Sequence, residues 1–186
     1  MKFVKLSVFA LLLLSVACTN DLNDSDSLVN QQEHVDSQYK AIFSTEKFEC
    51  YELPITKTEQ GELNQLIKVN DLPDIDIYFG NNIDTEYDDF PNKSIFYKNG
   101  EKLFVLYSEV IEMEDGFVLN LLKDTGEATT AFLPKVVTRS VGDGVAGCLV
   151  DAYSNHGWAS VLLSVQSAFL PQTMAAMAAA CVIKNI

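Results

Sequence analysis

Three hairpin turns in the middle of the chain constrain its fold more than any other feature. Asn99-Gly100 and Asp115-Gly116 are dipeptides that readily adopt the positive backbone φ angles of tight hairpin turns, and Thr125-Gly126 is a weaker signal of the same kind. The segments around them are rich in β-branched and aromatic residues. The sequence therefore predicts that the strands of residues 40–139 follow one another in an antiparallel β-meander.

Further strands are expected before the first of these turns, at about residues 48–55, 63–69 and 75–79. In the last of them apolar Ile75, Ile77 and Phe79 alternate with Asp74, Asp76 and Tyr78, which is typical of a strand with one buried face. The sheet should then contain about five to seven strands.

Two-residue loops at the turns fix which residues face each other across the sheet. The expected pairs are Ile95 with Phe104, Val110 with Leu121, Glu112 with Leu119 and, through Thr125-Gly126, Phe132 with Leu119. One face then buries Ile95, Phe104, Leu106, Val110, Leu119, Leu121 and Phe132. The opposite face is also largely apolar, with Leu103, Val105, Tyr107, Ile111, Met113, Val118 and Leu122, so another element must cover it.

The segment 140–186 differs from the strands before it. Its composition shifts to Ala, Met, Leu and Ser, its apolar residues recur at helical spacing, Asn155-His156-Gly157 indicates a helix stop, and Pro171 interrupts the pattern. We expect an apolar helical hairpin that covers the second face of the sheet, which makes the fold α+β.

The absence of charge in this segment leaves a membrane-spanning alternative open. No Asp, Glu, Lys or Arg occurs from Ala152 to Ile183. The pieces 158–170 and 172–183 are each too short to span a bilayer, but one helix kinked at Pro171 would be long enough.

The helical hairpin has a further consequence for the cysteines. It returns Cys181 to the first helix, within reach of Cys148, and in an oxidising compartment we expect the two to bond. The chain-entropy estimate for a loop of about 34 residues is about 3.8 kcal/mol. Cys50 is then the odd thiol, unless Cys18 is free to pair with it.

The first 17 residues have the layout of a secretory signal. A short basic start containing Lys2 and Lys5 precedes an apolar run of about nine residues, which is too short for a bilayer-spanning helix. The run closes on the small residues 15–17 before Cys18. This segment should be removed on export.

The residues Leu14-Ser15-Val16-Ala17-Cys18 resemble the lipobox of bacterial lipoprotein precursors. That resemblance implies that Cys18 is acylated and anchors the protein to a bilayer. Ser15 departs from the leucine usual three positions before the cysteine, and Ser15-x-Ala17 also fits ordinary signal peptidase, which would leave Cys18 as a free thiol.

Residues 18–39 are mostly polar and read as a disordered linker. The acidic residues directly behind Cys18 resemble the surface-export signal of Bacteroidota lipoproteins, and a plain solvated linker explains them equally well. The resemblance implies a location in the bacterial envelope, on the outer membrane or its surface.

Charge narrows the range of partners. The formal net charge of −13 becomes −15 when Lys2 and Lys5 leave with the signal. Nucleic acid is a poor partner, because binding it requires clustered Lys and Arg. The expected partners are the bilayer, through acylated Cys18, and an unidentified envelope or extracellular component.

Few residues suggest catalysis or metal binding. His156 has Asp151, Ser154 and Ser160 as sequence neighbours, but no nucleophile motif accompanies them, so no catalytic residue is assigned. No zinc motif is present in the sequence, and no cofactor is expected. The one weak calcium candidate is the acidic loop with Asp84, Glu86 and Asp88, flanked by Asn82 and Asp89; a solvated acidic loop is the default interpretation.

Two functions of different classes are consistent with the sequence. The first is a non-enzymatic envelope lipoprotein that binds a partner or serves a structural role. The second resembles some bacteriocin precursors in layout: residues 144–186 would be a disulfide-closed, membrane-active peptide behind a β-rich carrier. The near absence of charge in 144–186, where only Asp151 and Lys184 are charged, weighs against the second, because membrane-active helices normally carry a basic face.

Overall fold

The structure of the protein is a computed structural model, which describes residues 39–54, 62–136 and 143–183. By its internal contacts the chain divides into two units, Met1–Asp36 and Ser37–Ile186, and every described residue lies in the second. The predicted signal segment, Cys18 and almost all of the predicted linker lie outside the described residues.

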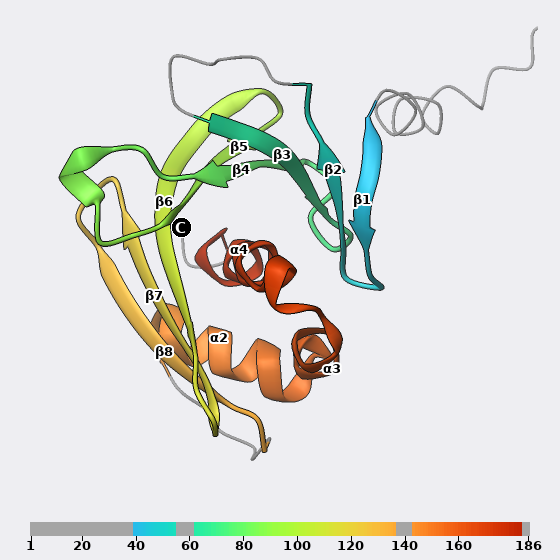
Figure 1. Cartoon of the computed structure of the whole chain (residues 1–186), viewed down its shortest axis with the longest axis vertical. Coiled ribbons are helices and arrows are strands. Elements are labelled where there is room, and N and C mark those ends of the chain that lie inside the picture. Colours follow the sequence, from blue (N-terminus) through green and yellow to red (C-terminus); the bar gives the residue numbers. More distant parts are fainter. Residues whose placement is uncertain (1–38, 55–61, 137–142, 184–186) are drawn as a thin grey trace, which may run out of the picture. The chain divides into compact units, whose positions relative to one another are not determined.

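In the described residues, eight strands form one antiparallel sheet in which each strand pairs with the next along the chain (Figure 1). They are β1 (Lys40–Ser44), β2 (Phe48–Glu52), β3 (Glu62–Val69), β4 (Ile75–Asn81), β5 (Asn92–Lys98), β6 (Glu101–Glu112), β7 (Gly116–Lys123) and β8 (Ala128–Pro134). The predicted α+β meander is confirmed, although the sheet has eight strands where about five to seven were expected. Strand β1 was not predicted from the sequence as a strand of its own. Its pairing with β2 shifts register between Ala41 and Phe43.

The Asn99-Gly100 turn has the geometry that its sequence predicts. Both residues have positive φ angles, 51° and 83°, as a type I′ turn requires. A β-bulge nevertheless follows the turn in β6. Phe96 pairs with Phe104 whereas Tyr97 pairs with Lys102, so β6 has one extra residue between these two pairs. The extra residue shifts the register by one.

This shift makes one predicted pair wrong. Ile95 lies opposite Val105 and not opposite Phe104. Since a one-residue shift moves a side chain to the other face, Ile95 belongs to the face of Val105 and Tyr107.

The second turn is centred one residue earlier than predicted. The N–H of Met113 donates to the carbonyl oxygen of Gly116 at 2.8 Å, so Glu114 and Asp115 form the loop. The predicted pairs of Val110 with Leu121 and Glu112 with Leu119 are therefore wrong. The observed partners are Leu119 for Val110 and Phe117 for Glu112. This two-residue shift leaves the buried face unchanged.

The third turn changes the face of Phe132. The N–H of Lys123 donates to the carbonyl oxygen of Glu127 at 3.0 Å, which makes the loop three residues long. Leu119 consequently pairs with Ala131 and not with Phe132, as the sequence had predicted. Phe132 turns outward and is 43% exposed, whereas Ala131 and Leu133 are buried.

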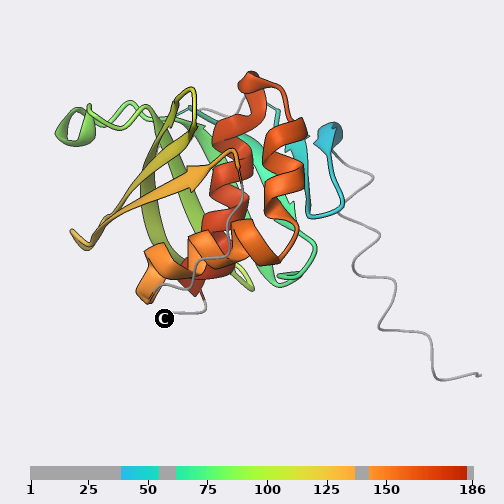
Figure 2. The ribbon, with the colours of Figure 1, turned by 90° about the horizontal axis from the view of Figure 1, so that it is seen from below.

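Three α-helices lie on the concave side of the curved sheet (Figures 1 and 2). They are α2 (Gly144–Asn155), α3 (Trp158–Ser164) and α4 (Leu170–Val182), and a short 3-10 helix, η2 (Ser167–Phe169), precedes α4. The sequence predicted a helical hairpin with a stop at Asn155-His156-Gly157 and an interruption at Pro171. Pro171 instead lies in the first turn of α4, where its missing N–H costs no helical hydrogen bond.

Helix α4 is central to the hydrophobic core. Eleven of its 13 residues are buried. The small alanine side chains let the helix backbone approach the sheet closely. Gln172 lies on the face that meets β3, because its Nε2 donates to Oε1 of Gln65 at 3.0 Å. Ala176 and Ala179 share that face by their helical spacing, and both are fully buried.

The helices cover the face of the sheet opposite to the one expected. Phe104, Leu106 and Leu119 share a single core cluster with residues of α2, α3 and α4. The prediction that the helices cover the face of Val105 is therefore wrong.

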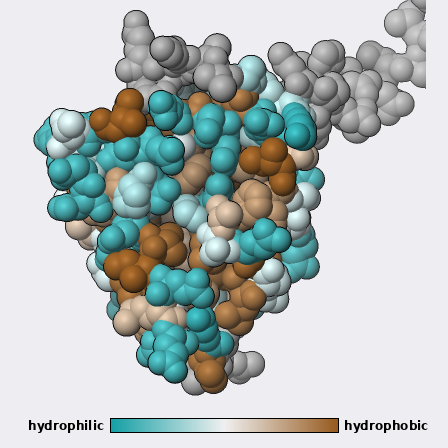
Figure 3. All heavy atoms as spheres, viewed as in Figure 1, coloured by the Kyte–Doolittle hydropathy of each residue, from teal (hydrophilic) through white to brown (hydrophobic). Residues whose placement is uncertain are grey.

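A loop covers part of that other face. Buried Leu63, Ile95, Val105 and Tyr107 pack with side chains from the segment 82–91, which contains the 3-10 helix η1 (Thr85–Tyr87). Other apolar residues stay two-fifths exposed or more: Leu103, Ile111, Met113 and Phe132. On the face drawn in Figure 3, hydrophobic residues form separate groups among hydrophilic ones.

Candidate functional site

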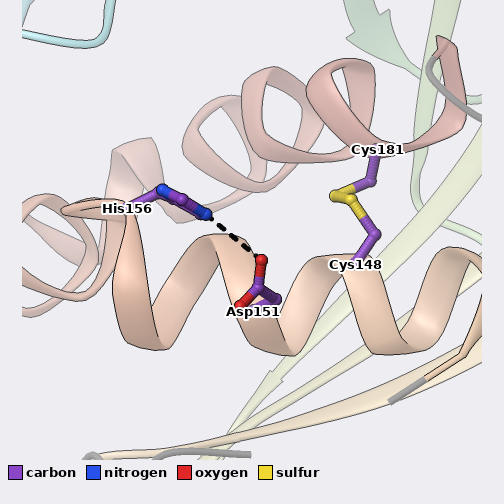
Figure 4. The surroundings of a disulfide bond; sticks show 4 residues. All are labelled: Cys148, Asp151, His156 and Cys181. Carbon is purple, nitrogen blue, oxygen red and sulfur yellow. Dashed lines mark hydrogen bonds and ion pairs between the residues drawn. A yellow bond between two sulfur atoms is a disulfide. The ribbon is translucent and has the colours of Figure 1, made fainter. Parts of the chain in front are cut away.

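A disulfide joins Cys148 of α2 to Cys181 of α4 (Figure 4). The Cα atoms of the two cysteines lie 5.5 Å apart. The pairing expected from the sequence is therefore present. It holds the C-terminal half of α4 against α2.

The C-terminal end of α2 forms a polar corner beside this disulfide. The N–H of His156 donates to the carbonyl oxygen of Ala152 at 3.1 Å, and Gly157 follows with a φ of 82°, as in many helix ends. The helix stop predicted at this point is confirmed. Nε2 of His156 lies 3.2 Å from Oδ2 of Asp151 (Figure 4). Nδ2 of Asn155 donates to Oδ1 of the same carboxylate at 2.7 Å.

The two serines near His156 are engaged differently. Oγ of Ser160 donates to the carbonyl oxygen of Gly157 at 2.7 Å, and Oγ of Ser154 is buried without a hydrogen-bond partner in the described part of the chain. Within the described ranges no hydrogen bond joins either hydroxyl to His156. The structure therefore gives Asp151 and His156 the geometry of a helix end and not that of a serine relay.

A cleft of about 480 Å³ opens next to this corner. Its lining comes from the β1–β2 turn, the β3–β4 turn, α2, the α2–α3 corner and α4. The polar side chains in the lining are those of Lys47, Asp71, Asp151 and His156. Leu72, Trp158 and the disulfide give it an apolar part. We refer to this site as the corner cleft.

Both walls of the corner cleft are cross-linked. On one side Asn70 ties the β3–β4 turn to the β1–β2 turn: its N–H donates to the carbonyl oxygen of Lys47 at 3.0 Å, and its Nδ2 donates to the carbonyl oxygen of Glu46 at 2.8 Å. On the other side the disulfide ties α4 to α2. A cleft held in this way is formed before a ligand arrives, which lowers the ordering cost of binding.

The side chain of Lys47 lies next to Gly157, at the end of α2. A Cβ atom placed on Gly157 would lie 3.3 Å from Cε and 3.7 Å from Nζ of Lys47, and 3.7 Å from Oε1 of Glu46. The glycine therefore leaves room for the lysine stem to lie against the helix end. Among the described residues, none forms an ion pair with the Lys47 ammonium within 4.0 Å.

A second groove, of about 460 Å³, separates the β1–β2 hairpin from α3. It is lined by residues 43–46 and by Ser160, Val161, Ser164 and Val165. Phe43, which lines the groove, stacks on Phe169 with ring centroids 4.5 Å apart. This groove carries one charged side chain, that of Glu46, and so offers less specific recognition than the corner cleft.

The acidic loop proposed as a weak calcium candidate has a structural role. Oδ1 of Asp84 accepts a hydrogen bond from the Glu86 N–H at 3.2 Å, and Oδ2 accepts one from the Tyr107 hydroxyl at 3.1 Å. Tyr87 stacks on Tyr107, which attaches the loop to the sheet. Burial, and after it the bond to Asp84, raises the pKa of Tyr107.

Three groups capable of binding one metal ion do not come together anywhere in the described residues. Asp84 is partly buried, whereas Glu86 and Asp88 are exposed. The three carboxylates are thus not gathered around one point.

No family model matches this chain, and no curated protein or solved structure matches it either. The assignment of a site therefore depends on geometry alone. In the described ranges, none of the helices has both the length and the apolar character needed to cross a membrane.

The corner cleft was not predicted from the sequence as a site. Its residues are scattered along the sequence between Lys47 and Cys181, so no local motif marks them. The only signal in the sequence was the helix stop at Asn155-His156-Gly157, which correctly locates one border of the cleft.

Cys50 is the free cysteine of the described residues, and it is completely buried. Burial raises the pKa of its thiol from 9.0 to about 12. We therefore predict that iodoacetamide at pH 8 leaves Cys50 unmodified in the folded protein and alkylates it after unfolding in urea without reductant. Mass spectrometry measures the adduct, and equal labelling rates in both states would contradict the described burial.

Proposed function

We propose that the protein is an exported lipoprotein that is anchored through acylated Cys18 and carries a non-catalytic binding domain. The observation that carries this proposal is the disulfide between Cys148 and Cys181. Disulfides persist in oxidising compartments, which agrees with the secretory signal and the lipobox-like residues around Cys18.

The corner cleft supports the binding role. Its volume of about 480 Å³ lies within the usual range of small-molecule sites, and its lining combines an apolar part with a few polar side chains. The cross-links in its two walls favour a fixed shape over an adaptable one. The protein would then hold its ligand close to the bilayer to which Cys18 is attached.

Anchoring is tested by replacing Cys18 with alanine. We expect the unmodified protein in the membrane fraction, where it resists extraction by high salt and by carbonate, since two acyl chains hold it in the bilayer. The Cys18→Ala variant is expected in the soluble fraction. Immunoblotting of fractionated cells measures the distribution.

A replacement in the polar segment behind the cysteine, Ser25→Ala, provides the control and should leave the protein membrane-bound. Two outcomes contradict the anchoring proposal: an unmodified protein found in the soluble fraction, or a Cys18→Ala variant that stays with the membrane. Incorporation of labelled palmitate into the unmodified protein identifies the acyl group directly.

The second candidate function, release of a membrane-active C-terminal peptide, is less well supported. A carrier should hold such a peptide loosely, because the peptide must leave. Helix α4 instead has 11 of its 13 residues buried and shares one core with strands β2 to β8. This packing supports a permanent structural role for the helices.

A further inference from the structure

We propose that the corner cleft binds a small zwitterion of the amino-acid or short-peptide class, with the ligand's carboxylate on Lys47 and its ammonium group toward Asp71. This inference depends on the binding role proposed above and specifies its ligand. Four observations support it: the charges in the lining, the position of Lys47, the apolar part, and the preformed walls.

The lining of the corner cleft carries charges of both signs. Lys47 and Asp71 contribute opposite charges from two different turns, and the carboxylate of Asp151 is already shared by His156 and Asn155. A purely anionic ligand would meet Asp71, Asp151 and a chain whose formal net charge of −13 becomes −15 without Lys2 and Lys5. A purely cationic ligand would meet Lys47. A ligand with both charges complements both groups.

Lys47 brings an ammonium group to the corner cleft. The lysine stem lies against Gly157, whose lack of a side chain permits this approach. Its ammonium has no ion-pair partner among the described residues, although acidic residues outnumber basic ones two to one in the chain, at 26 to 13. A positioned cation without an internal partner is available to a carboxylate from a ligand.

The corner cleft also has an apolar part. Trp158, Leu72 and the disulfide line the cleft together with the charged residues. Trp158 is only 4% exposed and packs on Phe48, with ring centroids 6.2 Å apart, so its position is fixed by the core. An apolar side chain of the ligand can be buried against this surface, which favours a peptide with an aliphatic residue over glycine.

The test uses the chain from residue 19 onward, which keeps every described element and removes the site of acylation. The probe is the dipeptide alanyl-leucine. Trp158 is the only tryptophan of the chain and lines the cleft, so its fluorescence reports binding directly. We expect a saturable change with a dissociation constant below about 1 mM.

Two blocked forms of the probe separate the contributions of its charges. N-acetylation removes the ammonium group, and amidation removes the carboxylate. Each should weaken binding about tenfold or more, because each deletes one charge-assisted contact. The Lys47→Gln variant should likewise bind the free dipeptide about tenfold more weakly than the unmodified chain does. It should bind the free and the amidated dipeptide with equal affinity.

A matched control is Lys98→Gln, which removes a lysine of the same charge at the ion pair with Asp74, outside the cleft lining. It should change the affinity less than about twofold. Absence of a saturable signal up to about 10 mM dipeptide would overturn the inference. Two other results would also overturn it: equal affinity of the unmodified chain for the free and the blocked dipeptides, or equal affinity of Lys47→Gln and the unmodified chain for the free dipeptide. Because the soluble chain is used, failure here leaves the anchoring through Cys18 unaffected.

Discussion

Replacing Leu149 by alanine is expected to lower the free energy of unfolding by about 2–5 kcal/mol. Leu149 lies in α2, is fully buried and belongs to the core cluster that joins the helices to the sheet. Its removal takes apolar area out of a packed interior and leaves a cavity that its neighbours fill only in part. Urea unfolding followed by far-ultraviolet circular dichroism measures the change.

The control for this prediction is the same substitution at an exposed leucine. Leu163 lies in α3 and is 48% exposed, so Leu163→Ala should change the free energy of unfolding by less than about 1 kcal/mol. Similar losses for Leu149→Ala and Leu163→Ala would mean that α2 does not pack on the sheet in solution.

Loss of the disulfide should have an effect of comparable size. The cysteines are 33 positions apart, and the chain-entropy estimate for such a loop is about 3.8 kcal/mol. We expect the double variant Cys148→Ala/Cys181→Ala to lose about 2–5 kcal/mol in the free energy of unfolding, because the open chain gains conformations mainly in its unfolded state.

Reductant supplies the internal control for the disulfide. Dithiothreitol should destabilise the unmodified protein by nearly the same amount as the double substitution, and it should leave the double variant unchanged. Buried Cys50 remains in both proteins and takes no part in the bond. A destabilisation of less than about 1 kcal/mol would show that the disulfide is not formed or that it closes no entropic loop.

The sequence predicted the fold class because its strongest signals are local. The Asn99-Gly100 turn, the alternation of 75–79 and the helix stop near His156 each depend on a few neighbouring residues. The Cys148–Cys181 pair followed from the helical spacing and the reversal between the helices. These features depend on backbone preferences that hold in almost any tertiary context.

The side-chain pairing could not be predicted as well, because it depends on loop length and on bulges. A bulge after Asn99-Gly100 moved Ile95 to the other face, and a three-residue loop around Thr125-Gly126 turned Phe132 outward. Neither leaves a clear pattern in the sequence, and a shift of a single residue reverses every side chain of a strand.

The choice of the covered face was wrong for a related reason. Both faces of the meander are apolar, so hydrophobicity does not decide which one the helices occupy. The loop 82–91 covers part of the face of Val105, and its role depends on the Asp84–Tyr107 hydrogen bond, which joins residues 23 positions apart. The corner cleft was missed for the same reason, since its residues meet only after folding.

The central claim is that the C-terminal helices are a permanent part of the core, and native-state hydrogen exchange of α4 tests it most directly. We predict that the slowest amides of α4, around Ala176 and Ala179, exchange with the same free energy of opening as the slowest amides of β3 and β6, because only global unfolding exposes them. An opening free energy for α4 several kcal/mol below that of the strands would contradict the claim, since the helix could then leave a sheet that remains folded.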